Sequence, residues 1–436
     1  MRDGAERAGF RVVDLRGQAI TRAGVRAVLP RAVADLEAVI PAAAATIAAV
    51  RTGGFAALAA FAARFDGVEP AALQEVIVRS RRFAAAQLPP PVLVGFEAGA
   101  QVSLNWFPIE RAGVYVPGGK AVYPSSVVMN VVPAQVAGVA SIALVSPPQA
   151  EHGGLPHPTI LATAAMLGIQ EVYAIGGAQA IAALAYGVED EAAERRLAPV
   201  DVITGPGNVH VAAAKRLVRG TVAIDMEAGA TEVMILADAL ADPVLIAADL
   251  VCQAEHDELA AAILVTDSMS LAAAVQAELA RQAAATPNAT RVRAALAGAQ
   301  SGIVLVDDLD QAIRVCDAYA PEHLEVHSAD ADGIAGRIRN AGAIFIGATT
   351  PVSLGDYCAG SNHVLPTGGT ATHASGLTVH SFLRAVQTIR YPEAALERLR
   401  DAVQVLSDAE LLPAHGAAVQ ARFGSRRRTA VRTSSA

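Results

Sequence analysis

The regular alternation of short apolar runs with amphipathic stretches is the feature that most limits how this chain can fold. A first series occupies residues 141–225 and includes the strand-like runs SIALVS, EVYAIGG and VDVITGPG. A second series occupies residues 231–347 and includes TEVMILAD, AAAILVT and GAIFIG. Strands that alternate with helices are typical of βαβ units, in which helices cover a parallel sheet. The sequence therefore predicts an α/β protein with two doubly wound lobes.

Helical patterns flank these two series. Residues 28–67 read as helices that break at Gly53 and Gly54, and after Gly376 the pattern becomes purely helical. The last residues, from Gly424, combine several arginines with no apolar periodicity. We expect a helical N-terminal region, a helical C-terminal tail and a solvated end.

Composition and charge exclude several classes of protein. With 53% hydrophobic and 17% charged residues, the chain can bury large cores and is not disordered overall. Its net charge of -8 disfavours binding to nucleic acid or to an anionic membrane. Pro124 and Pro133 interrupt the uncharged stretch 121–150, so we expect a buried helix and strand there rather than a membrane span. Small solutes become the expected ligands.

Two features favour a reducing, cytoplasmic location. Residues 1–17 mix charges of both signs and lack the apolar core of a secretory signal. The three cysteines, Cys252, Cys316 and Cys358, are odd in number and have no CxxC spacing. This pattern fits neither a disulfide framework nor a thiolate zinc site.

Three glycine-rich turns follow expected strands, at residues 114–120, 175–180 and 204–208. The carboxyl ends of parallel strands are where such sheets open a ligand crevice, and glycine lets backbone amides approach a phosphate. The usual dinucleotide fingerprint, GxGxxG, is absent from the sequence. Each turn taken alone is more often a plain tight turn than a ligand contact.

A dispersed set of polar residues is more informative. Gln253 and His256 are three residues apart near the end of an expected helix and so share one face. Asp356 and His363 lie in a glycine-rich loop after an expected strand, whereas His415 alone reads as a structural histidine in an apolar setting. One amide oxygen, one carboxylate and two imidazoles suit a zinc-type ion with open positions. The residues alone leave open whether the set converges.

Glu322 and His323 are adjacent where an expected helix gives way to a strand. An acid and a base at such a corner can serve two proton transfers, while the simpler interpretation is a histidine at a helix end. We interpret the remaining histidines of interest as ordinary surface residues, namely His152, His157, His327 and His380.

The sequence resembles the histidinol dehydrogenase family, in its actinobacterial form, over essentially the whole chain. The motifs that carry the resemblance are VRTGGFAALAAFAARFDGV, GVYVPGGKAVYPSSVVMNVVPAQVAGV, EVYAIGGAQAIAALAYG, VDVITGPGN, QAEHDE, PEHLE and GDYCAGSNHVLPTGG. The resemblance implies oxidation of L-histidinol to L-histidine through L-histidinaldehyde, with two NAD molecules and one zinc ion per chain. It also implies two incomplete Rossmann-like lobes and a homodimer whose C-terminal tail reaches the partner's site.

The same resemblance assigns roles to individual residues. It implies Gln253, His256, Asp356 and His415 as zinc ligands and Glu322 and His323 as the catalytic pair. It implies cofactor contacts by Tyr115, Gln179 and Asn208. Its implied substrate contacts are Thr231, Gln253, His256, His323, Asp356, His363, Glu410 and His415.

The expected domain layout follows from the pattern and the resemblance together. Residues 1–25 are an N-terminal extension, and residues 26–115 and 230–375 form the first lobe, with the metal and catalytic residues. Residues 116–229 form the second lobe, on the NAD side. Residues 376–423 are a helical tail that completes the partner's site, and residues 424–436 are a disordered tail.

Three positions depart from the family pattern. Ala230 and Thr231 replace a proline and a serine, and Val352 stands where some relatives have a glutamate near the substrate. Because of these changes, a second interpretation stays open, in which the protein is a related zinc dehydrogenase that acts on another small alcohol. A non-catalytic NAD- or metabolite-binding protein is a further alternative, which the retained Glu322, His323 and metal ligands disfavour.

The expected chemistry divides between two residues. The alcohol loses a proton as hydride leaves, and His323 has a suitable unperturbed pKa for that base. The aldehyde must be hydrated before it donates hydride, and Glu322 is the candidate that activates water. A thiohemiacetal on Cys252 or Cys358 is the rival route, although buried cysteine is more often a small apolar residue.

Overall fold

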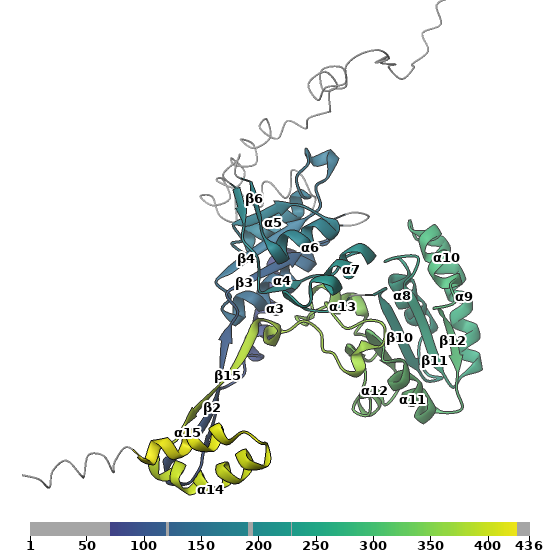
Figure 1. Cartoon of the computed structure of the whole chain (residues 1–436). Helices are drawn as coiled ribbons and strands as arrows, with labels where there is room; N and C mark the ends of the chain where they lie inside the picture. The colour runs from purple at the N-terminus through teal and green to yellow at the C-terminus, as the bar shows by residue number, and fades with distance from the viewer. Residues whose placement is uncertain (1–69, 119–121, 191–194, 228, 425–436) are drawn as a thin grey trace, which may run out of the picture.

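The computed structural model describes residues 70–118, 122–190, 195–227 and 229–424. The extension expected at 1–25, the helices expected within 28–67 and the tail beyond 424 lie outside the described residues. Two five-stranded parallel sheets dominate the described chain, so the expected α/β class with two lobes is confirmed (Figure 1).

The first sheet, with its helices, is called the N-lobe here. Its strand order is β5-β4-β3-β8-β9, and all of its neighbours are parallel. The strands are β3 (Arg111–Tyr115), β4 (Ser141–Ser146), β5 (Glu171–Ala174), β8 (Val202–Thr204) and β9 (Ala223–Ile224). The helices are α3 (Pro70–Ala86), α4 (Pro124–Ala137), α5 (Pro158–Met166), α6 (Gly177–Tyr186) and α7 (Val209–Val218), with a hairpin of β6 (Val188–Asp190) and β7 (Arg195–Leu197).

The second sheet, with its helices, is the C-lobe. Its order is β12-β11-β10-β13-β14, again parallel throughout. The strands are β10 (Glu232–Ala237), β11 (Ala261–Thr266), β12 (Gly302–Leu305), β13 (His323–His327) and β14 (Ala343–Ile346). The helices are α8 (Pro243–Ala254), α9 (Met269–Ala285), α10 (Ala289–Ala297), α11 (Leu309–Tyr319), α12 (Ala331–Ala335) and α13 (Val352–Tyr357).

Each lobe is an incomplete Rossmann unit. Counted within its lobe, each sheet has the strand order 3-2-1-4-5, which is the order of a dinucleotide-binding sheet without its sixth strand. Each sheet also has a separate apolar cluster on each face, because helices cover both sides. The order reverses between β3 and β8 in the N-lobe and between β10 and β13 in the C-lobe.

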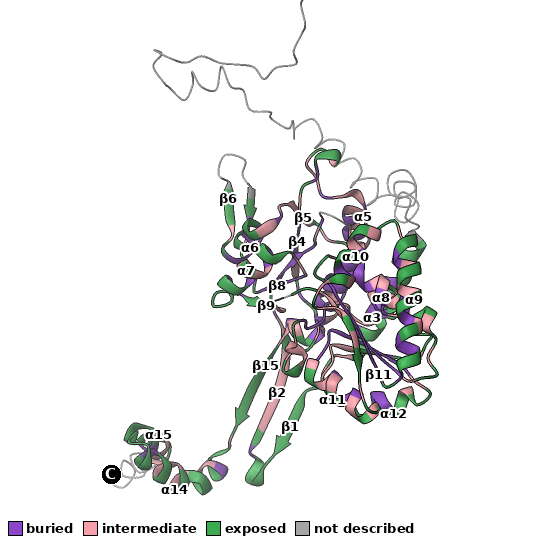
Figure 2. Cartoon of the chain, turned by 90° about the vertical axis from the view of Figure 1, so that its right-hand side faces the viewer, coloured by how far each residue is buried: buried purple, intermediate pink, exposed green. Residues whose placement is uncertain are grey.

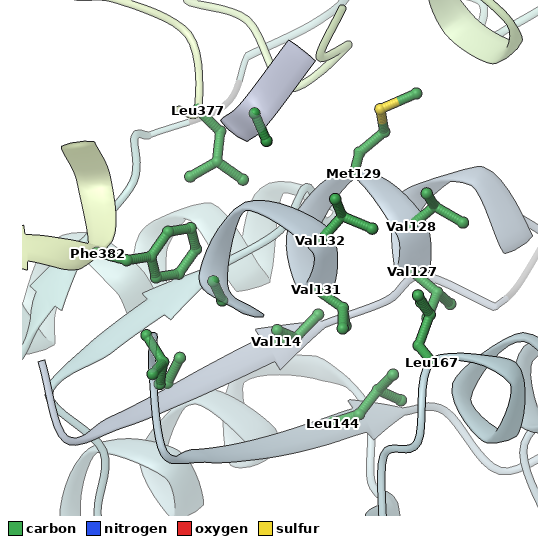
Figure 3. Packing of buried hydrophobic residues seen from close by; sticks show 14 of the residues in the cluster. Val114, Val127, Val128, Met129, Val131, Val132, Leu144, Leu167, Leu377 and Phe382 are labelled. Carbon is green, nitrogen blue, oxygen red and sulfur yellow. The ribbon is translucent and has the colours of Figure 1, made fainter. Parts of the chain in front are cut away.

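The largest of these clusters surrounds α4, the helix expected within the uncharged stretch 121–150 (Figure 3). Val127, Val131 and Val132 are fully buried on this helix. Leu377 and Phe382, from the segment after the C-lobe, pack on the same cluster. The uncharged helix is therefore a core element, as the sequence predicts, and within the described ranges no helix is long and apolar enough to cross a membrane.

A third sheet, the arm, projects from the lobes (Figures 1 and 2). It is antiparallel, with the order β1-β2-β15, and its far end carries two helices. Its elements are β1 (Val92–Gly95), β2 (Gln101–Pro108), β15 (Leu383–Arg390), α14 (Glu393–Ala409) and α15 (Pro413–Gly424). Single 3-10 turns complete the fold at Glu97–Gly99, Ala150–His152, Thr370–Thr372 and Val379–Phe382.

Two details differ from the sequence prediction. The pattern after Gly376 is not purely helical, because Leu383–Arg390 forms β15 and pairs along the whole of β2. The segment Arg111–Tyr115, expected with the metal-bearing lobe, is β3 at the centre of the N-lobe sheet. In both cases a distant strand supplies the hydrogen bonds, which local periodicity does not register.

Candidate functional site

The three glycine-rich turns lie at one edge of the N-lobe. They follow β3, β5 and β8, so all three are at carboxyl ends of parallel strands. The amide of Gly177, at the start of α6, donates to the hydroxyl of the buried Tyr115 at 3.1 Å. Asn208 is the N-cap of α7, and its Oδ1 accepts from the amide of His210 at 3.0 Å. Tyr115, Asn208 and the exposed Gln179 of α6 therefore belong to this single edge.

A buried ion pair fixes the turn after β8. Lys215 pairs with Asp225, and both side chains are almost fully buried. Lys215 Nζ also donates to the carbonyl oxygen of Gly205 at 3.0 Å, while Asp225 Oδ2 accepts from the Gly205 amide at 2.7 Å. Gly205 has φ +109°, and an added Cβ would overlap the carbonyl oxygen of Tyr115. Only glycine fits this close approach between the β3 and β8 turns.

The catalytic pair expected from the sequence lies at the amino ends of the C-lobe strands, whereas the glycine turns lie at carboxyl ends of the N-lobe strands. Glu322 precedes β13 and His323 is its first residue. Glu322 Oε2 accepts from Thr231 Oγ1 at 2.6 Å and from the Glu232 amide at 2.9 Å. Thr231 also accepts from Gln253 Nε2 at 2.9 Å. The Thr231 hydroxyl thus joins the carboxyl of the predicted catalytic pair to a predicted metal ligand.

The environment prepares both members of the pair for proton transfer. Burial raises the pKa of Glu322, although the nearby His323 and the two hydrogen bonds oppose the shift. His323 Nδ1 lies 2.9 Å from the carbonyl oxygen of Glu232, which can only accept. The ring therefore carries its proton on Nδ1 and leaves Nε2 free as a base.

Gln253, His256 and Asp356 are brought to this same edge by two helices. Gln253 is in the last turn of α8, His256 follows that helix, and Asp356 is in the last turn of α13. Gln253 is 2% exposed, and its Oε1 has no hydrogen-bond partner among the described residues. A buried amide oxygen without a partner is unusual and fits a site that receives a cation.

His363 lies beside these groups and connects the lobes. Its pKa is lowered by burial first, with Asp356 opposing the shift and His323 and His256 adding to it. Its Nδ1 is 3.0 Å from the carbonyl oxygen of Asp356, and its Nε2 is 3.3 Å from Ser126 Oγ on α4. Since α4 follows β3, the carboxyl edge of the N-lobe meets the amino edge of the C-lobe here.

The remaining predicted residues are not at this site within one chain. Glu410 ends α14 and His415 lies on α15, and both are exposed. Both helices are at the far end of the arm, away from α8 and α13 (Figure 1). The described chain therefore places three of the four predicted zinc ligands at one edge of the C-lobe.

One histidine expected on the surface is buried in the structure, and the cysteines behave as the sequence predicts. His327, expected on the surface, is 3% exposed and lies beside Asp249 and Glu325. The i, i+2 spacing of Glu325 and His327 on an expected strand was the available signal.

The three cysteines, all within the described ranges, are free. Burial raises the pKa of Cys252 to about 12, which disfavours a thiolate nucleophile there.

Comparison with known proteins agrees with this geometry. Residues 68–423 match the family model for histidinol dehydrogenase. The histidinol dehydrogenases of Nocardia farcinica and Mycobacterium tuberculosis are each 55% identical over 433 residues, covering 94% of this chain and 97% of theirs. The crystal structure of histidinol dehydrogenase from Elizabethkingia anophelis has 30% identity and a TM-score of 0.77, covering 92% of this chain and 94% of that one. The chain therefore belongs to the histidinol dehydrogenase family.

Proposed function

We propose that this protein oxidises L-histidinol to L-histidine through L-histidinaldehyde, with two NAD molecules in succession, as a zinc-containing homodimer of the cytoplasm. The observation that carries the proposal is the cluster at the amino edge of the C-lobe. There the Glu322 and His323 pair is joined through Thr231 to Gln253, whose amide oxygen has no partner in the described part of the chain.

Zinc fits the donors at this edge. Gln253 offers a buried free oxygen, His256 an imidazole and Asp356 a carboxylate, which together suit a borderline ion with room for substrate. We assign these three residues, with His415 of the partner subunit, as the ligands of one zinc per chain. The ion supplies positive charge that orients the substrate at the catalytic pair.

NAD fits the carboxyl edge of the N-lobe sheet. The switch in strand order between β3 and β8 is where sheets of this kind bind dinucleotides, and the glycine turns follow the carboxyl ends of strands at this edge. We assign Tyr115, Gln179 and Asn208 to this cofactor, which accepts the hydride in each oxidation. The contact between Ser126 and His363 supports transfer across the boundary of the lobes.

The chain's own residues then divide the two oxidations. His323 Nε2 takes the hydroxyl proton of the alcohol, while its Nδ1 is held by the Glu232 carbonyl. Glu322, whose pKa is raised by burial, is a stronger base than an exposed carboxylate and removes a proton from water as the aldehyde is hydrated. Thr231 and His363 of the same chain contact the substrate, together with Glu410 of the partner subunit.

The arm supports the proposed homodimer. Apolar side chains on it are exposed, including Leu93, Ile389, Val405 and Leu411. A partner that covers them would also receive Glu410 and His415 from the end of the arm, so each site would contain residues of both chains. Mixing His323→Ala chains with His415→Ala chains should then restore about a quarter of wild-type activity. If subunits exchange and the mixture stays inactive, each site is built from one chain.

The direct test is the stoichiometry of NADH formation. Limiting L-histidinol should yield two NADH per molecule, with L-histidine as product, while a panel of other small alcohols should react poorly. A better rate with another alcohol would point to a different substrate, and the absence of NADH with all of them would reject the proposal.

A further inference from the structure

The C-lobe contains a second cluster of ligating groups, outside the proposed zinc site. Asp249 lies on α8, one turn before Gln253, and Glu325 and His327 lie on the same face of β13 as His323. His327 Nε2 is 3.3 Å from Glu325 Oε2 and 4.0 Å from Asp249 Oδ2. One ligand atom from each of the three residues lies within 4.8 Å of the others.

The atoms of this cluster lack ordinary partners. Glu325 is fully buried and His327 is 3% exposed. Glu325 Oε2 and both ring nitrogens of His327 have no hydrogen-bond partner in the described residues. The other oxygen of Glu325 accepts from the Val352 amide at 2.8 Å, so Oε2 is held facing the cluster. Buried polar atoms left unpaired in this way cost free energy unless another group satisfies them.

The charges of the cluster point the same way. The carboxylates of Asp249 and Glu325 approach each other in a buried setting, with the imidazole of His327 beside both. Burial and Glu325 together raise the pKa of Asp249 to about 7, with His327 opposing the shift. A bound cation would remove this repulsion and would satisfy the unpaired atoms at the same time.

We propose that Asp249, Glu325 and His327 bind a second divalent cation of the zinc type, which has a structural role. Ligands around a tetrahedral zinc ion lie about 3.4 Å apart, close to the two separations in the cluster. Asp249 can also bind through both carboxylate oxygens. The cluster is enclosed, so the ion would not contact substrate. It would instead tie α8 to β13, the elements that carry Gln253 and His323.

Metal content distinguishes this site from the proposed catalytic one. Full-length protein is loaded with zinc chloride, desalted and analysed for zinc per chain. His327→Gln should bind one equivalent less than wild type, and added zinc should raise its melting temperature less. The matched control, His373→Gln, changes an exposed histidine and should bind as much zinc as wild type.

The inference does not rest on the proposed function, and its failure would be separate. His256→Gln should lose the equivalent at the proposed catalytic site, whatever happens at His327. If His327→Gln folds and retains every equivalent of wild type, the second site does not exist and the triad shares a proton instead. Should His327→Gln fail to fold, Asp249→Asn gives the same comparison at a less buried residue.

Discussion

The two lobes have the same strand order but present their chemistry at opposite edges. In the N-lobe the glycine turns and the residues assigned to NAD follow the carboxyl ends of β3, β5 and β8. In the C-lobe Glu322 and His323 lie at the amino end of β13, beside Gln253 and Asp356. Strand order therefore places a switch point in each lobe, while the residues at each edge decide whether that edge can act.

At the carboxyl edge of the C-lobe, two carboxylates bind groups of the chain itself. Asp238 follows β10, and its Oδ2 accepts from Ser328 Oγ at 2.7 Å and from the Ala329 amide at 2.8 Å. Asp242 caps α8 by accepting from the Val244 amide at 2.8 Å. Both of these carboxylates therefore already have partners in the chain. At the amino edge, by contrast, α8 and α13 end with Gln253 and Asp356, and an amide oxygen is unpaired among the described residues.

The largest expected effect is that of His323→Asn in the C-lobe, which tests whether the two lobes have separate roles. It removes the proposed base of the alcohol step, so kcat with histidinol should fall by about 10²- to 10⁴-fold. The KM for NAD should stay near its wild-type value, because the N-lobe edge is intact. Steady-state kinetics with NAD and histidinol varied in turn measure both. A rise in the KM for NAD as large as the fall in kcat would mean that the lobes do not divide the work.

Glu322→Gln should show the second largest effect, on oxidation of supplied histidinaldehyde, where we expect a loss of about 10²-fold. The base must be ionised, and burial raises its pKa, so wild-type kcat/KM should fall as the pH falls through that raised value. The Gln variant should lack this acidic limb, whereas His323→Asn should keep it. An unchanged pH profile in Glu322→Gln would remove Glu322 from the water-activating role.

Gly205→Ala tests the N-lobe edge with a smaller effect. Its positive φ and the overlap of a Cβ with the Tyr115 carbonyl should lower stability by about 1–3 kcal/mol. Displacing the turn should also raise the KM for NAD by about tenfold, which corresponds to about 1.4 kcal/mol of binding. Gly220→Ala, in the same lobe, places its Cβ in open space and is the matched control. Equal behaviour of the two variants would show that the turn does not contact NAD.

The sequence predicted the lobes better than it predicted the arm or the second cluster. Alternating periodicity identifies β4, β5 and β10 because each strand is a local apolar run. It did not identify β15, whose residues are mostly exposed and gain their hydrogen bonds from β2, far away in sequence. The proposed catalytic pair is visible in the sequence as two adjacent residues, Glu322 and His323. The triad with Asp249 is not, because it depends on how α8 packs over β13.

The smallest expected effect comes from the most closely matched pair of variants. Both variants change a helix-capping residue, and both changes are at the carboxyl edge of a lobe. Asn208 caps α7 in the N-lobe, and Asp242 caps α8 in the C-lobe. Each substitution by alanine should lower stability by about 1 kcal/mol, since each removes one capping acceptor. If the carboxyl edge binds cofactor only in the N-lobe, Asn208→Ala alone should raise the KM for NAD, by a few fold. Chemical denaturation and NAD titrations of the two variants measure the two quantities separately. Parallel changes in the KM for NAD would mean that helix stability, rather than contact with the cofactor, controls binding at both edges.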